Sequence, residues 1–260
     1  MLTKIKKYVA LTLVLVTFFS MNSVIANGSR SKGQSDASYA NFRNVRAGRI
    51  GVNNLYRSQH PANGSSRSVY ANKLAKKYGI RTVVNLSDSK NSLKRYFRKK
   101  KISPSYYYRA LYNNNRVYTA HMREYHNGSA YRKKVAAGMR FIIKHKGPYL
   151  IHCEVGRDRT GYVILLLECL MGAPYDYMVN DYAQSYINVN HYSAAKARAK
   201  AITCLNNELH YMTGKSKKTN WSKTDLVKGA EGYLKKCGMT YREITKLKKS
   251  LSTSYPAPRK

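Results

Sequence analysis

Residues 152–161 read His-Cys-Glu-Val-Gly-Arg-Asp-Arg-Thr-Gly, and this stretch decides the fold. The apolar segment 149–152 precedes it, and the segment 162–171, in which the only charged residue is Glu168, follows it. A short apolar run next to turn residues predicts a buried strand, and a longer run that is apolar on all sides predicts a core helix. The sequence therefore predicts a strand, a tight loop and a helix, with Cys153 where the loop begins.

Working outward, strand and helix patterns alternate from Leu55 onward. We expect further strands at 82–86 and 106–112, and helices at 66–78 and 129–146. Thr240 and Glu243 form a capping box that opens a helix through residue 250. This alternation predicts an α/β fold with a mostly parallel central sheet flanked by helices, and a basic, helical C-terminal part beyond residue 173. The loop at 153–159 should lie at the carboxyl end of a central strand, where open α/β sheets bind ligands.

The N-terminal segment has the pattern of a secretory signal peptide. Lysines at 4, 6 and 7 precede a mostly apolar stretch at 8–21, and small or modest residues end at Ala26. We expect cleavage after Ala26 and a secreted or extracytoplasmic protein; the alternative is an uncleaved N-terminal anchor. Residues 27–44, rich in Ser, Gly and Asn, are expected to form a flexible leader, 45–251 one domain and 252–260 a tail. No second apolar stretch is long enough to span a membrane, so we expect no transmembrane span in the mature chain.

The chain carries a formal net charge of +36. Such a charge favours anionic partners, including phosphorylated substrates, phosphoinositide headgroups, acidic surfaces and nucleic acid. No nucleic-acid recognition motif accompanies the charge, so we expect no specific nucleic-acid partner. The basic run at 94–101 is interpreted as a solvated loop, with a dedicated binding patch as the alternative.

The chain has four cysteines. Outside the cytoplasm an even number suggests pairing, and Cys204 with Cys237 is the pair that could close a C-terminal loop. The alternative is three buried structural thiols and one reactive thiol. Cys153 and Cys169 should be too far apart to bridge, because a helix separates them.

The loop residues suit the capture of a phosphate dianion. Backbone amides from 154 to 159 and the dipole of the following helix favour a thiolate at Cys153. Gly156 allows the tight turn that curls these amides around phosphate oxygens. The planar guanidinium of Arg159 matches two of those oxygens. The pattern predicts a phosphate site with a sulfur nucleophile.

Neighbouring side chains have more open roles. Thr160 is expected to donate a hydrogen bond to the Cys153 sulfur. His152 either orders the loop from below or is a buried structural histidine. Glu154 would place a carboxylate near the mouth of the site, paired with Arg57 or Arg157.

The loop resembles that of the cysteine-based protein tyrosine phosphatase superfamily, which reads His-Cys-x-x-Gly-x-x-Arg-Ser/Thr-Gly. More narrowly it resembles bacterial secreted tyrosine/serine protein phosphatases, whose loop carries Gly-Lys-Asp-Arg. Segments 55–61, 79–86, 181–186 and 238–240 fit the same branch, so the resemblance covers about residues 45–250. Arg157 stands where that branch usually has a lysine. The arginine keeps the positive charge but differs in the length and shape of its side chain.

The resemblance implies a protein tyrosine phosphatase-like fold and hydrolysis of phosphate monoesters through a phosphocysteine, without metal or cofactor. Asp158 would be the general acid, with Glu124 or Asp88 as alternatives, or would only orient the loop by binding amides or Arg57. The implied catalytic residues are Cys153, Asp158, Arg159 and Thr160. The implied phosphate-binding residues are Glu154, Val155, Gly156, Arg157, Asp158 and Arg159, with His152 and Arg57 in support.

Three functions are compatible with this site. The first is a phosphatase acting on phosphotyrosine or phosphoserine proteins or on phosphoinositides. The second is a related enzyme for inositol polyphosphates, suggested by Arg157 and Glu154. The third is a catalytically silent phosphate-binding module.

Overall fold

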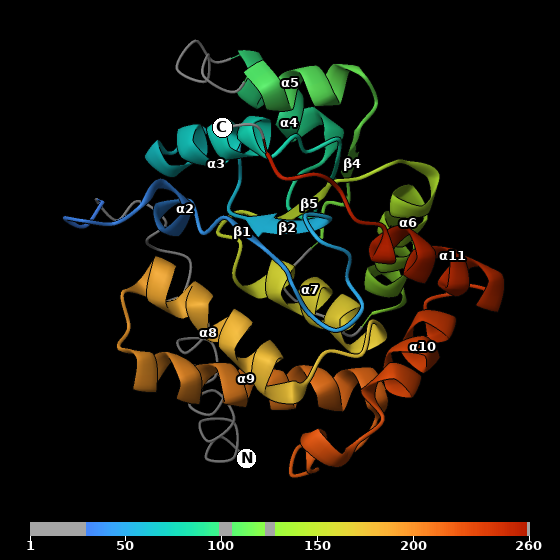
Figure 1. Cartoon of the computed structure of the whole chain (residues 1–260). Coiled ribbons are helices and arrows are strands. Elements are labelled where there is room, and N and C mark those ends of the chain that lie inside the picture. The colour runs from blue at the N-terminus through green and yellow to red at the C-terminus, as the bar shows by residue number, and fades with distance from the viewer. Residues whose placement is uncertain (1–29, 99–105, 123–127, 259–260) are drawn as a thin grey trace, which may run out of the picture.

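The computed structural model describes residues 30–98, 106–122 and 128–258. At its centre lies a five-stranded sheet with the order β1-β2-β5-β3-β4 (Figure 1). The strands are β1 (Arg43–Asn44), β2 (Leu55–Ser58), β3 (Thr82–Asn85), β4 (Val117–Thr119) and β5 (Tyr149–His152). Only β1 pairs antiparallel; β2, β5, β3 and β4 run parallel. The prediction of a mostly parallel α/β sheet is confirmed.

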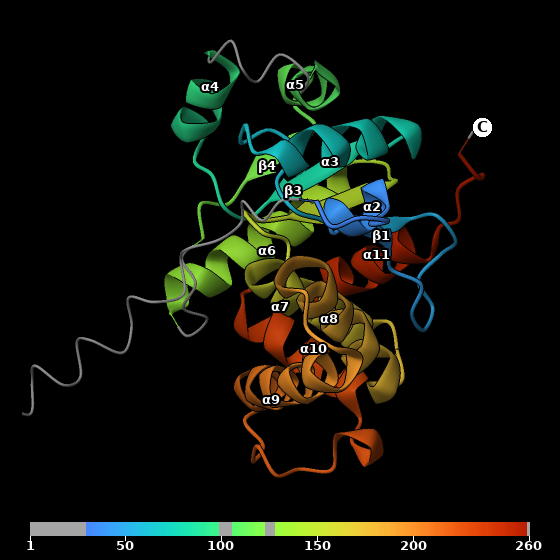
Figure 2. The same cartoon turned by 90° about the vertical axis from the view of Figure 1, so that its left-hand side faces the viewer.

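Helices cover both faces of the sheet (Figure 2). One face carries α2 (Asp36–Tyr39), α3 (Ser66–Lys77), α4 (Lys90–Arg98) and α5 (Tyr106–Asn113). The other face carries α6 (Ser129–Lys144) and α7 (Asp158–Leu170), and beyond them α8 (Tyr175–Asn190), α9 (Ala194–Thr213), η2 (Trp221–Lys223), α10 (Leu226–Lys236) and α11 (Tyr241–Ser252). The predicted helices at 66–78 and 129–146 are confirmed, and so is the capping box that begins α11.

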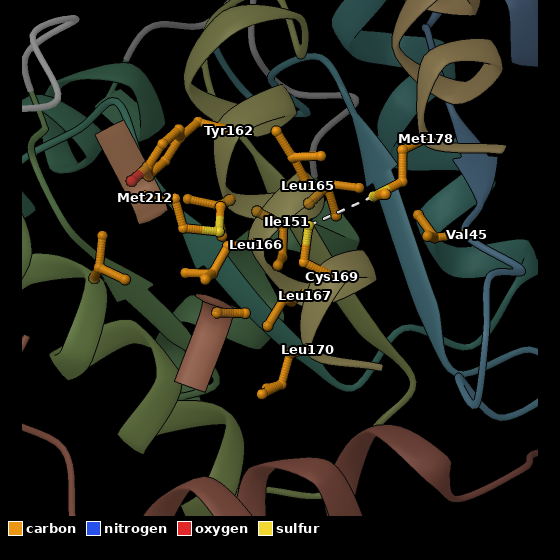
Figure 3. Close-up of a cluster of buried hydrophobic side chains, with 14 of the residues drawn as sticks. Val45, Ile151, Tyr162, Leu165, Leu166, Leu167, Cys169, Leu170, Met178 and Met212 are labelled. Atoms are coloured by element: carbon orange, nitrogen blue, oxygen red, sulfur yellow. Dashed lines mark hydrogen bonds between the residues drawn. The ribbon is translucent and has the colours of Figure 1, made fainter. Parts of the chain in front are cut away.

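Side chains of the central strands alternate between two cores. Leu150 and Val83 pack in the cluster under α3, whereas Ile151 and Val84 pack in the larger cluster around α6 and α7. Successive residues of a strand point to opposite faces, which explains this division. In Figure 3 the α7 side chains fill the larger core, and Cys169 Sγ lies 3.6 Å from Met178 Sδ of α8. A helix buried on every side gives the loop before it a rigid support.

The predicted strand at 106–112 is wrong, because these residues form α5. Their tyrosines suggested β-structure, since aromatic residues are enriched in strands. In α5 only Tyr108 is fully buried, and its amide donates to Asn72 Oδ1 of α3 at 2.9 Å. Packing against α3 therefore overrides the local propensity. The strand in this part of the sheet is β4, which follows α5.

Two further predictions need correction. The basic run was expected to be a loop, but its part at 94–98 belongs to α4, whose buried residue is Leu93; residues 99–101 lie outside the described residues. The predicted leader is not flexible from Asp36 onward, since this part forms α2 and β1 and buries Tyr39 and Phe42. A few well-spaced apolar residues are enough to hold this segment against the sheet, because β1 pairs with β2.

The predicted signal peptide at 1–26 lies outside the described residues. Within the described ranges no helix is long and apolar enough to cross a membrane.

Candidate active site

The loop that follows β5 lies at the carboxyl end of the strand, between β5 and the start of α7 at Asp158. Cys153 is buried, with 2% of its surface exposed, and the Gly156 amide donates to its Sγ at 3.2 Å. Gly156 has φ +75°, and a Cβ at this position would lie 2.2 Å from the Ser58 carbonyl oxygen. No larger residue fits this turn without moving β2. The predicted tight turn at Gly156 is thus present, with its amide directed at the thiol.

Arg57 of β2 supports the loop from beneath. The strand register sets Arg57 beside Ile151, one residue before His152. Its Nη2 donates to the Gly156 carbonyl oxygen at 3.0 Å, and the Asn41 Nδ2 donates to the same oxygen at 3.1 Å. The guanidinium is almost fully buried. Arg57 therefore holds the loop where the sequence analysis expected a supporting residue.

A carboxylate that the sequence analysis did not assign to the site, Asp181 of α8, neutralises this arginine. It accepts hydrogen bonds from Arg57 Nη1 and, at 2.6 Å, from Arg43 Nε. Both guanidinium groups also donate to Ser185 Oγ, at 3.2 and 2.8 Å. Burial alone would raise the pKa of Asp181, but the two arginines hold it below its usual value.

Arg43 was missed because it falls in the segment interpreted as a leader. Asp181 occurred only as part of the family-like segment 181–186. No local pattern links either residue to the loop, since the contacts join β1, β2 and α8.

His152 orients the beginning of the loop. Its Nδ1 lies 3.1 Å from the Cys153 carbonyl oxygen, which can only accept, so Nδ1 carries the proton. Its Nε2 then accepts from the Tyr108 hydroxyl at 2.8 Å. Burial lowers the pKa of His152 well below its usual value, in agreement with a neutral ring. His152 is thus a buried structural histidine that also orders the beginning of the loop, so both interpretations from the sequence apply to it.

Asp88 lies behind His152 in a saturated network. Its Oδ2 accepts from His60 Nε2 at 2.5 Å and from Asn85 Nδ2 at 2.9 Å, and its Oδ1 accepts from Ser92 at 3.2 Å. Burial would raise the pKa of Asp88, but these donors, with His60 first, hold it well below its usual value. Asp88 is buried, so it cannot approach a leaving group without breaking these hydrogen bonds inside the protein.

The structure therefore argues against Asp88 as the general acid. The other alternative, Glu124, lies outside the described residues.

Asp158 and Arg157 form an ion pair at the N-terminus of α7. Arg157 Nε and Nη2 donate to the two carboxylate oxygens at 2.8 and 3.0 Å. Arg157 also donates to Asn190 Oδ1 at 2.5 Å, and its Cζ lies 5.1 Å from the centre of the Tyr186 ring. The side chain of Asp158 is 47% exposed, against 19% for Arg157. Asp158 therefore faces solvent, and its expected alternative partner, Arg57, is engaged by Asp181 instead.

Arg159 follows in the first turn of α7, and its Nη1 donates to the Met122 carbonyl oxygen at 3.2 Å. The predicted hydrogen bond from Thr160 to the Cys153 sulfur is not formed: Thr160 Oγ1 is buried and has no hydrogen-bond partner among the described residues.

Two more loop residues have defined partners. Glu154 Oε1 accepts from Asn63 Nδ2 at 2.6 Å, so its predicted pairing with Arg57 or Arg157 is wrong. Both arginines are already bound by closer carboxylates, those of Asp181 and Asp158. The Val155 carbonyl oxygen accepts from Asn41 Nδ2 at 3.4 Å.

The geometry combines a buried thiol, an amide directed at it, and an arginine on the first turn of the next helix. Backbone amides and a guanidinium stabilise a dianionic group, and a thiol is a nucleophile when ionised. In the described part of the chain, no group of three or more His, Cys, Asp or Glu side chains is arranged to hold a metal ion.

The tyrosine phosphatase family model matches residues 37–253. The chain therefore belongs to the tyrosine phosphatase family, and its activity class is that of a phosphatase, a hydrolase. The match begins within α2, in agreement with the packing of α2 and β1 against the sheet. A comparison with curated proteins returned no match.

Proposed function

We propose that the protein hydrolyses phosphate monoesters through a phosphocysteine intermediate on Cys153. The observation that carries this proposal is the Gly156 amide, 3.2 Å from a buried Cys153 Sγ at the carboxyl end of the central strand β5. In the first step the sulfur attacks phosphorus, and the bond to the leaving-group oxygen breaks. In the second step water attacks the phosphocysteine, the sulfur–phosphorus bond breaks, and inorganic phosphate leaves.

Arg159 is proposed to bind two equatorial oxygens of the transferred group. Its contact with the Met122 carbonyl oxygen is a single hydrogen bond to a neutral acceptor. A charge-assisted bidentate contact with a dianion is stronger, so the substrate would draw the guanidinium from Met122 to the phosphate.

Asp158 is proposed to protonate the leaving oxygen. Both of its oxygens accept from Arg157. This pair has to open before Asp158 can deliver a proton, and the partial exposure of both side chains leaves room for that movement. A positioned acid raises the rate by about 10²–10⁴-fold.

The proposed substrates are phosphorylated proteins or phosphoinositides, which agrees with the net charge of +36. Inositol polyphosphates are the second candidate, because Arg157 adds a second cation to the loop. Two partners within the protein, Asp158 and Asn190, engage Arg157. A second phosphate would have to displace them, which favours substrates that present one phosphate to the loop.

The test is an assay of wild type and Cys153→Ser on a phosphotyrosine peptide, a phosphoserine peptide, a phosphoinositide and phytate. Cys204→Ser is the matched control, because Cys204 is a free thiol whose hydrogen bond with the Tyr186 hydroxyl a serine can keep. We expect wild type and Cys204→Ser to turn over at least one of these substrate classes, and Cys153→Ser to turn over none. Acid quenching with labelled substrate should trap a phosphoenzyme in wild type. Activity that survives in Cys153→Ser would refute the mechanism, and the absence of wild-type turnover on all four would support a silent binding module.

We also propose that residues 1–26 direct export and are removed after Ala26. The basic start and short apolar stretch of this segment support the proposal. N-terminal sequencing of the exported protein should begin at Asn27. Retention of the full-length chain inside the producing cell would contradict it.

A further inference from the structure

A cleft lies at the end of the sheet opposite the catalytic loop. It has a volume of about 540 Å³, and its polar lining consists of Arg81, Arg116, Lys144 and Lys146. Its apolar lining is formed by Ile80, Tyr107 and Leu111.

The strand directions show why this cleft is separate from the active site. Arg81 directly precedes β3, Arg116 directly precedes β4, and Lys146 lies three residues before β5 begins. Cys153 directly follows β5. In a parallel sheet the amino ends of the strands gather at one end of the sheet and the carboxyl ends at the other. A four-residue strand is about 13 Å long, so the two sites lie at opposite ends of the sheet.

Among the described residues, the cations of the cleft have no counter-charge. All four side chains are exposed. No carboxylate of the described part of the chain lines the cleft, and none of the four cations forms an ion pair with a described residue. Three arginines around the catalytic loop differ, since Arg43, Arg57 and Arg157 each have a carboxylate partner. Four like charges around one hollow repel one another, and a bound anion would relieve that repulsion.

The apolar side of the cleft is rigid. The Tyr107 hydroxyl donates to the Ile80 carbonyl oxygen at 2.7 Å, which fixes the ring at the wall. Burial raises the pKa of Tyr107, while the nearby charge of Arg81 acts against that shift. Both Tyr107 and Arg81 line the cleft. Such a wall suits the carbon skeleton of a ligand whose charged groups reach the four cations.

We propose that this cleft binds a small polyanion with two or more phosphate groups, either free in solution or as the headgroup of a lipid. The site does not include Cys153, so it would supply a binding function separate from phosphate hydrolysis.

The cleft between α9 and α10 provides a matched control. It has a volume of about 440 Å³, and its cations are Lys215, Lys223, Lys228 and Lys236. Here, however, Asp225 also lines the cleft, at the N-terminus of α10. Removing two charges from either cleft changes the net charge of the protein equally, so general attraction of anions by a basic protein affects both variants alike.

The first experiment measures binding of inositol hexakisphosphate by calorimetry at physiological salt, in the full chain carrying Cys153→Ser to prevent turnover. Arg81→Gln/Arg116→Gln should lose one class of site, or weaken it by at least about tenfold, through the loss of two charge-assisted contacts. Lys215→Gln/Lys223→Gln should retain it. A second pair of substitutions in the same cleft, Lys144→Gln/Lys146→Gln, should cause the same loss of binding. This second variant tests the site independently if the first variant alters folding. Equal binding by the test and control variants, or no binding by the parent, overturns the proposal.

The second experiment identifies the source of the ligand. Vesicles containing phosphatidylinositol bisphosphate are compared in flotation with phosphatidylserine vesicles of equal charge. Loss of inositol-lipid binding in Arg81→Gln/Arg116→Gln supports a headgroup ligand. Unchanged flotation together with lost inositol hexakisphosphate binding supports a soluble ligand. Catalysis is assayed separately with Cys153 intact. The binding result for the cleft can therefore be interpreted even if the proposed hydrolysis is not observed.

Discussion

Both carboxylate oxygens of Asp158 accept hydrogen bonds from the neighbouring Arg157, at 2.8 and 3.0 Å. The pair lies at the start of α7, next to the loop that carries Cys153. Arg157 is held in turn by Asn190 and the Tyr186 ring of α8. The residue proposed as general acid is therefore positioned through one arginine by α8, the next helix in the chain.

The role of Asp158 can be tested with leaving groups of different quality. Asp158→Asn should reduce kcat on an alkyl phosphate by about 10²–10⁴-fold, because a poor leaving group needs a proton. The loss on an activated aryl phosphate, which leaves as a stable anion, should be far smaller. Steady-state kinetics on the two substrates provide the measurement. Equal losses on both would remove Asp158 from proton transfer.

The buried ion pairs of Asp181 should be important for stability. Asp181→Asn leaves Arg43 and Arg57 without their shared counter-charge in a buried site, so the free energy of unfolding should fall by about 3–5 kcal/mol. Activity should fall as well, because Arg57 holds the Gly156 carbonyl oxygen. Urea denaturation and kcat measurements check both effects.

Asp176→Asn is the matched control for Asp181→Asn, since its pair with Arg198 is exposed. Exposed pairs contribute about 0–1 kcal/mol. A similar loss of stability in the two variants would contradict the importance assigned to Asp181.

The glycine turn should be needed for catalysis. Gly156→Ala would place Cβ 2.2 Å from the Ser58 carbonyl oxygen at φ +75°, so the loop has to move. A displacement of about 1 Å in a catalytic group can cost about 10²-fold in rate, and we expect a loss of that order in kcat/KM. Gly238→Ala is the control, because it has φ +87° but no atom within 4 Å of the added Cβ. Normal activity in Gly156→Ala would show that the loop tolerates a side chain there.

Glu168, buried inside α7, should make stability depend on pH. Burial raises the pKa of Glu168 well above its usual value. In the unfolded chain the same carboxyl group loses its proton at about pH 4.3. Above that pH the folded protein retains a proton that the unfolded chain has lost, so the contribution of Glu168 to stability declines as the pH rises through the folded pKa. Glu168→Gln cannot titrate.

Urea denaturation at a series of pH values from about 5 to 8 should therefore show the stability of Glu168→Gln rising relative to wild type, by at most about 1.4 kcal/mol per pH unit. Glu231→Gln, which removes a half-buried carboxylate paired with Lys248, controls for the general effect of losing an acid. A difference between Glu168→Gln and wild type that stays constant with pH would contradict the buried, protonated state.

Several elements could be predicted from short stretches because their causes are local. β5 and α7 follow from apolar runs, and α11 begins at a capping box that needs only Thr240 and Glu243. The prediction failed at α5, where tyrosines suggested a strand, and at α2 and β1, where a polar composition suggested a leader. In these segments burial against α3 and pairing with β2 decide the structure, and neither is visible from local composition.

The sequence by itself determined the reactive loop, because Cys153, Gly156 and Arg159 are close in the chain and their spacing sets how a strand turns into a helix. Only the tertiary structure decided what surrounds the loop. Arg57 and Asp181 are 124 residues apart and meet beneath the loop because the sheet order and the position of α8 bring them together. The cationic cleft arises in the same way, from strand ends that are remote in sequence. Contacts of this kind depend on how whole helices and strands pack, so they cannot be predicted from the spacing of residues along the chain.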